Sequence, residues 1–116
     1  MPTVLSRETL ATMHCTPMEG SRAMSDAEIS VQLALLPGWA FVDGALQRTF
    51  ALRDYHDTIG FVNALAWMIH REDHHPDLHV GYNRCTVRWN THSVGGVSVN
   101  DFVCAAHTDA IFGRDA

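Results

Sequence analysis

The chain has 116 residues, enough for one compact domain with a sizeable core and too few for two. Hydrophobic residues make up 47% of the sequence, but charges interrupt the longest apolar runs, so we expect no membrane-spanning segment. The formal net charge is -5 and the eight Lys and Arg residues are scattered, which disfavours direct binding of nucleic acid.

The cysteines and the N-terminal residues favour a cytoplasmic protein. Cys15, Cys85 and Cys104 are an odd number and lie far apart, without the short spacing of a zinc knuckle. Arg7 and Glu8 fall where a signal peptide would need an uninterrupted apolar stretch. We therefore expect reduced thiols and no secretion.

Residues 1–23 mix Pro, Gly, Ser, Thr and Met without a sustained period, so we interpret them as an N-terminal arm. The domain proper is expected over residues 24–116. Ser25 and Glu28 have the spacing of a capping box, which predicts the start of a first helix. Apolar residues at helical spacing follow, up to a stop at Pro37-Gly38: Ile29, Leu33, Leu35 and Leu36.

A hairpin is predicted next, because Asp43-Gly44 separates residues 39–42 from an alternating stretch at 45–52. From Asp54 to Arg71, apolar residues recur at steps of three and four, which predicts the longest helix. Its apolar stripe is formed by Ile59, Val62, Leu65, Ala66 and Ile69.

Two further strands are predicted at 78–82 and 85–90, joined by a tight turn at Asn83-Arg84. Ser98 and Asp101 then have the spacing of a second helix cap, and apolar residues continue at helical spacing to Ala110. The expected order is α-β-β-α-β-β-α. This order predicts an α+β fold, a four-stranded antiparallel sheet with helices on one face.

Histidines are the unusual feature of the composition, because five of the eight fall within residues 70–92. His74 and His75 lie where the long helix gives way to a strand, and Pro76 keeps His75 out of helical angles. His92 lies just past the last strand. A hairpin leaves and returns at the same edge of a sheet, so we expect these three rings to converge.

Converged imidazoles suit proton transfer near neutral pH, and nearby carboxylates such as Asp73 and Asp101 could orient them. Two alternatives remain open from the residues alone. Adjacent histidines are often solvated loop residues. Histidines with carboxylates also bind zinc or iron, although only His70 and His74 have helical metal-ligand spacing.

The spacing of these residues resembles that of the pterin-4a-carbinolamine dehydratases. The matching positions, with every gap kept, are His70, His74-His75-Pro76, Tyr82, His92 and Asp101. Leu35-Leu36-Pro37-Gly38-Trp39, Arg48-Thr49-Phe50 and Phe61-Val62 are also similar to family features, so the resemblance covers about residues 25–112.

The resemblance implies a lyase without a metal or an organic cofactor. Such an enzyme removes water from 4a-hydroxytetrahydrobiopterin to give quinonoid dihydropterin, which recycles the pterin of aromatic amino acid hydroxylases. His74 and His92 would be the proton-transfer pair, with His75 assisting. The residues expected to hold or orient the pterin are His75, Asp101, Asp73, Trp39, His70 and Thr91. For Trp39, packing in the core is the alternative.

One position departs from the family pattern, since its first residue is commonly glutamate and is His70 here. Glu72 lies two residues later on the helix, points elsewhere and does not replace it.

The alternative function is a non-catalytic pterin-binding or dimerisation protein of the same fold. The resemblance implies a homodimer or homotetramer. A homodimer would also follow if the last strand, 85–90, lay at a sheet edge, because that edge would be poorly protected against pairing with a copy of itself.

Overall fold

A computed structural model describes residues 4–113 of the chain. Its helices are α1 (Arg7–Leu10), α2 (Asp26–Leu33), α3 (Tyr55–Glu72) and α4 (Val99–Gly113), with a short 3-10 helix η1 (His92–Val94). Its strands are β1 (Ala40–Val42), β2 (Ala45–Ala51), β3 (Asp77–Val80) and β4 (Arg84–Trp89). Within the described residues, no helix is both long and apolar enough to cross a membrane.

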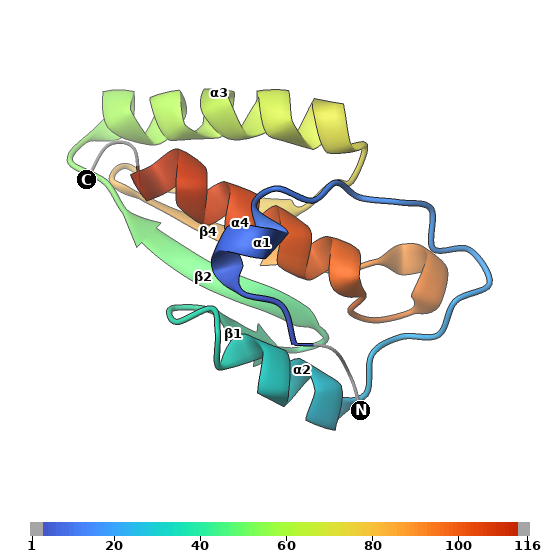
Figure 1. The fold of residues 1–116 in the computed structure, drawn as a ribbon. Coiled ribbons are helices and arrows are strands. Elements are labelled where there is room, and N and C mark those ends of the chain that lie inside the picture. The colour runs from blue at the N-terminus through green and yellow to red at the C-terminus, as the bar shows by residue number, and fades with distance from the viewer. Residues whose placement is uncertain (1–3, 114–116) are drawn as a thin grey trace.

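The four strands form one antiparallel sheet in the order β1-β2-β4-β3. Helices α3 and α4 lie side by side and both contact the sheet (Figure 1). The α+β fold with a four-stranded antiparallel sheet is therefore confirmed. The edge position considered for the last strand is wrong, because β4 pairs with β2 on one side and β3 on the other.

Local sequence features account for where the elements begin and end. Ser25 and Glu28 form the predicted capping box at the start of α2. The first hairpin turns at Asp43 and Gly44, whose φ angles of 48° and 82° both lie in the left-handed region that such a turn requires. The second turn comes earlier than predicted: β3 ends at Val80, so Tyr82 lies in the turn instead of the strand.

The core lies between the sheet and the two long helices. Phe50 and Trp89 contribute the largest fully buried side chains of the sheet, and Phe102 contributes the largest of α4. Phe50 also contacts Phe61 of α3, with ring centroids 5.0 Å apart. Burial at both faces of α4 explains why nearly every residue from 100 to 106 is apolar or has a hydrogen-bonded polar side chain.

The N-terminal arm is docked on this layer, and packing continues across the boundary expected at residue 23. Leu10 of α1 is fully buried in the core, and α1 contacts α4 (Figure 1). Two amide side chains hold the arm by its backbone. Gln32 accepts from the Leu5 N–H and donates to the Leu5 carbonyl, at 2.9 and 2.6 Å, and Asn100 bonds Thr16 in the same reciprocal way, at 3.1 and 2.7 Å.

Candidate active site

His74 is positioned where α3 ends. Asp73 adopts left-handed angles (φ 51°, ψ 44°) at the helix C-terminus, and the chain then runs into β3. The His74 ring stacks on Trp89, with centroids 5.5 Å apart and planes 12° from parallel. Its Nε2 lies 2.6 Å from Oδ1 of Asp101, and only 13% of the side chain is exposed. Stacking on Trp89 therefore fixes the plane of the His74 ring, and the contact with Asp101 fixes its rotation within that plane.

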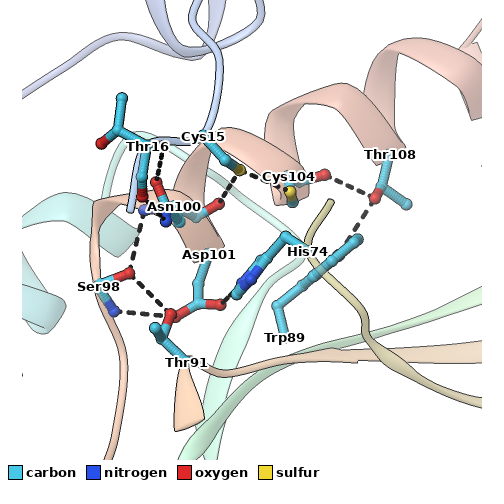
Figure 2. A network of polar contacts seen from close by, with 10 residues as sticks. All are labelled: Cys15, Thr16, His74, Trp89, Thr91, Ser98, Asn100, Asp101, Cys104 and Thr108. Carbon is cyan, nitrogen blue, oxygen red and sulfur yellow. Dashed lines mark hydrogen bonds and ion pairs between the residues drawn. The ribbon is translucent and has the colours of Figure 1, made fainter. Parts of the chain in front are cut away.

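Asp101 is the fully buried centre of a hydrogen-bond network in the first turn of α4. While Oδ1 faces His74, Oδ2 accepts from the Thr91 hydroxyl at 2.7 Å and from the Ser98 N–H at 2.9 Å (Figure 2). The second contact is half of the helix cap predicted from the Ser98–Asp101 spacing. The carboxylate thus caps a helix and orients a histidine at the same time, which fixes its position closely.

A cavity of about 400 Å³ lies beside this network. This volume is within the range of small-molecule sites in proteins. Five of the residues predicted for the site line it: Asp73, His74, His75, Thr91 and His92. His75 and His92 are exposed, whereas His74 is mostly buried, so the three histidines do converge but in different environments.

Trp39 and His70 are not among the residues that line this cavity. The Trp39 indole N–H points to both carboxylate oxygens of Asp109, at 3.0 Å each, and Arg48 pairs with the same carboxylate at 2.7 Å. Burial raises the pKa of Asp109, and the indole and the guanidinium offset part of that rise. Trp39 therefore has a packing and hydrogen-bonding role in the core, and His70 is exposed on α3.

Several residues at the site were not predicted from the sequence. Residues 15–19 of the arm form one wall of the cavity, together with Asn100 and Glu72. Glu72 does lie on a different side of α3 from the exposed His70, but it is buried against the arm, where Oε1 accepts from the Cys15 N–H at 2.8 Å. Trp89 was expected only as a strand residue. Trp89 lies at the far end of the hairpin that follows His74, and this was the sequence feature that could have predicted their contact.

The fold and the site together define a small α+β protein with a paired histidine and buried carboxylate beside a ligand-sized cavity. Residues 22–111 match the family model described as pterin 4 alpha carbinolamine dehydratase. The chain therefore belongs to the pterin-4a-carbinolamine dehydratase family, which confirms the resemblance found in the sequence.

Curated relatives agree over nearly the whole chain. A protein of Stenotrophomonas maltophilia is 52% identical over 105 residues, covering 88% of this chain and 90% of its own length. One of Nitrosospira multiformis is 47% identical over 104 residues, covering 89% and 92%. Both carry the name pterin-4-alpha-carbinolamine dehydratase on a provisional basis.

A solved structure supports the same assignment. The crystal structure of a transcriptional coactivator/pterin dehydratase from Brucella melitensis is 34% identical in sequence, with a TM-score of 0.74. The match covers 78% of this chain and 98% of that one.

Proposed function

We propose that this protein dehydrates 4a-hydroxytetrahydrobiopterin to quinonoid dihydropterin in the cavity beside His74. The observation that carries the proposal is the pairing of His74 with the fully buried Asp101 at 2.6 Å, next to His75 and His92. Membership of the dehydratase family supports the substrate class. Aromatic amino acid hydroxylases generate the hydroxylated pterin, and the product would serve them again once a separate reductase has returned it to the tetrahydropterin.

His74 is suited to act as the base. Asp101 accepts from Thr91 and Ser98 as a carboxylate does, so we assign the proton of the third contact to Nε2 of His74. A neutral imidazole protonated on Nε2 carries a lone pair on Nδ1. This tautomer, fixed by Asp101 and by stacking on Trp89, would take the proton of the pterin ring N–H.

His92 would serve as the acid. When the ring N–H is deprotonated, the nitrogen electron pair forms a double bond to C4a and the C4a–O bond breaks. The leaving hydroxide takes a proton from protonated His92 and departs as water, so protons and electrons balance. The exposure of His92 on η1 lets it regain a proton from solvent. The exposed His75 and Asp73, together with the buried Thr91, would hold the ring.

The test follows the ultraviolet change of a chemically generated 4a-hydroxytetrahydropterin. We expect wild type to exceed the spontaneous rate, and His74→Ala and His92→Ala each to slow the enzyme by about 10²–10⁴-fold. His79→Ala is the matched control, because His79 is exposed on β3 and does not line the cavity. Wild type no faster than the spontaneous reaction would refute the dehydratase, and His79→Ala as the most damaging change would refute the assigned residues.

A second candidate function is that of a dimerisation or adapter protein, favoured by the coactivator name of the Brucella melitensis structure. A homodimer or homotetramer is compatible with both functions. Helix α3 carries Trp67, whose exposed fraction of 79% is unusual for tryptophan, on the surface that an assembly could cover. Sedimentation of wild type and Trp67→Glu tests whether an assembly forms through α3. If it does, Trp67→Glu should dissociate it.

A cytoplasmic location is part of the same proposal. Cys15, Cys85 and Cys104 are all free thiols, which supports a reducing compartment. Labelling of the thiols in freshly lysed cells, before any reducing agent is added, tests it.

A further inference from the structure

A second group of histidines lies outside the proposed catalytic set. His14 belongs to the N-terminal arm, Glu72 ends α3, and His107 lies in the middle of α4. One ligand atom from each of the three lies within 4.8 Å of the others. We propose that this trio binds a divalent transition-metal ion of the zinc type and that the ion fastens the arm to the helical layer. The proposal is independent of the dehydratase function.

The three side chains already face one another. Nδ1 of His14 lies 2.7 Å from Oε2 of Glu72, and the rings of His14 and His107 stack with centroids 6.2 Å apart and planes 25° from parallel. The Met13 carbonyl, next to His14 in the arm, accepts from Nε2 of His107 at 2.8 Å. Small side-chain movements would bring the three ligand atoms to the ~2.0–2.2 Å metal distances of zinc.

The charge of the trio also suits a cation. The Glu72 carboxyl group accepts hydrogen bonds from the Cys15 N–H, from His14 and from Arg71, which is the pattern expected of an ionised carboxylate. Glu72 is therefore an anion at neutral pH, although only 1% of its side chain is exposed. Arg71 donates to Oε2 at 3.0 Å and competes with the ion for that oxygen. Metal binding displaces this contact and the hydrogen bond from His14.

Ligand chemistry narrows the kind of ion. Two imidazole nitrogens and one carboxylate oxygen are common ligands of Zn²⁺, whereas Mg²⁺ and Ca²⁺ prefer oxygen ligands alone. The His14 side chain is 67% exposed, so an ion can reach the trio from solvent, and water can complete a tetrahedral site. Because the ligands come from the arm, α3 and α4, the ion would act as a cross-link.

The cross-link would stabilise one wall of the cavity. Cys15 follows His14 directly and lines that cavity together with Glu72. Cys15 also contacts Cys104 of α4 through its sulfur (Figure 2), with the two Sγ atoms 3.4 Å apart. An ion held by His14 would therefore fix the arm immediately before the residues that form the wall.

The experiment uses untagged full-length protein, dialysed against a chelator and titrated with ZnCl₂ in a calorimeter. We expect one equivalent to bind and His14→Ala to weaken the affinity by about 100-fold or more. His56→Ala is the matched control, because it removes one exposed histidine from the start of α3 and leaves the trio intact. His14 is exposed in the arm, so its loss does not open the core.

Two further variants test where the ion binds. Glu72→Gln keeps the size of the side chain but removes its charge, and should weaken zinc by a similar factor. His92→Ala should leave zinc affinity unchanged, because His92 lies among the cavity residues and outside the trio. Absence of stoichiometric zinc binding, or a loss of binding in His92→Ala with none in His14→Ala, would overturn the proposal.

A structural readout separates the cross-link from adventitious binding. Trypsin cleaves after Arg22, which is exposed at the end of the arm. Zinc should slow this cleavage several-fold in wild type and in His56→Ala, because a tethered arm opens less often. Equal protection in His14→Ala would contradict the proposed ligands.

Discussion

The two histidine groups are each built around a buried carboxylate, but they are assembled in different ways. Asp101 orients His74 and receives its hydrogen bonds from residues of the segment 70–101, which one hairpin folds together. Glu72 receives hydrogen bonds from its neighbour Arg71 and from a separate segment, the arm, since His14 lies 58 residues away in sequence. Proximity along the chain makes the first group visible in the sequence. The second group exists only when the arm docks.

The largest effect is expected from Asp101→Asn, which damages the first group alone. An asparagine amide can donate to His74, so the ring would favour the tautomer with its proton on Nδ1 and lose its function as base. We expect the dehydration rate to fall by about 10²–10³-fold, equivalent to about 3–4 kcal/mol. Stopped-flow absorbance measures it.

Zinc titration of the same variant is the control. Its zinc affinity should match wild type, because Asp101 is not one of the three proposed metal ligands. A variant that lost both properties would indicate general unfolding, which circular dichroism detects, and would remove the distinction between the two groups.

A smaller effect is expected from Leu10→Ala, which loosens the element that carries His14. Leu10 is fully buried, so removing its side chain should leave a cavity and lower the free energy of unfolding by about 2–4 kcal/mol. Urea denaturation measures the change. Leu35→Ala is the matched control, since Leu35 is 40% exposed and its loss should change stability by less than about 1 kcal/mol. Equal stability of both variants would show that the arm does not contribute to the core.

The smallest effect concerns the ion pair between the exposed Arg22 and the half-buried Glu28, where the arm meets α2. The hydrogen bond from Arg22, followed by the contact with Ser25, lowers the pKa of Glu28 to about 2. A carboxyl whose pKa is lowered by folding adds stability above its unfolded value, and this stability is lost as the pH falls toward 2. Arg22→Gln should move the pKa part of the way back toward 4.5, leaving the effect of Ser25. An NMR titration that showed no change would contradict the assignment.

Much of the fold could be predicted because local features agree with the tertiary structure. The capping box at Ser25, the Asp43-Gly44 turn and the 3.6-residue period of α3 each specify an element without reference to the rest of the chain. The pairing of β4 with two other strands depends on long-range contacts. No local feature of the sequence could therefore show whether β4 lies at the edge or inside the sheet.

The candidate site was predicted in part for the same reason. His74, His75 and His92 flank a single hairpin, and their convergence follows from that topology. The cavity wall at residues 15–19 could not be inferred, because no periodicity in the arm indicates where it docks. Trp39 was predicted as a site residue from the family resemblance alone. In the structure its indole N–H donates to Asp109 in the core.

The docked arm also has a practical consequence for producing the protein. The family model begins at residue 22, which invites a shortened gene starting there. Such a product would lack Leu10 and one wall of the cavity, and its Glu72 and Asn100 would lose the backbone groups that they bind. Inclusion bodies or weak turnover from the shortened gene would therefore reflect the missing arm and would say nothing against the chemistry of His74.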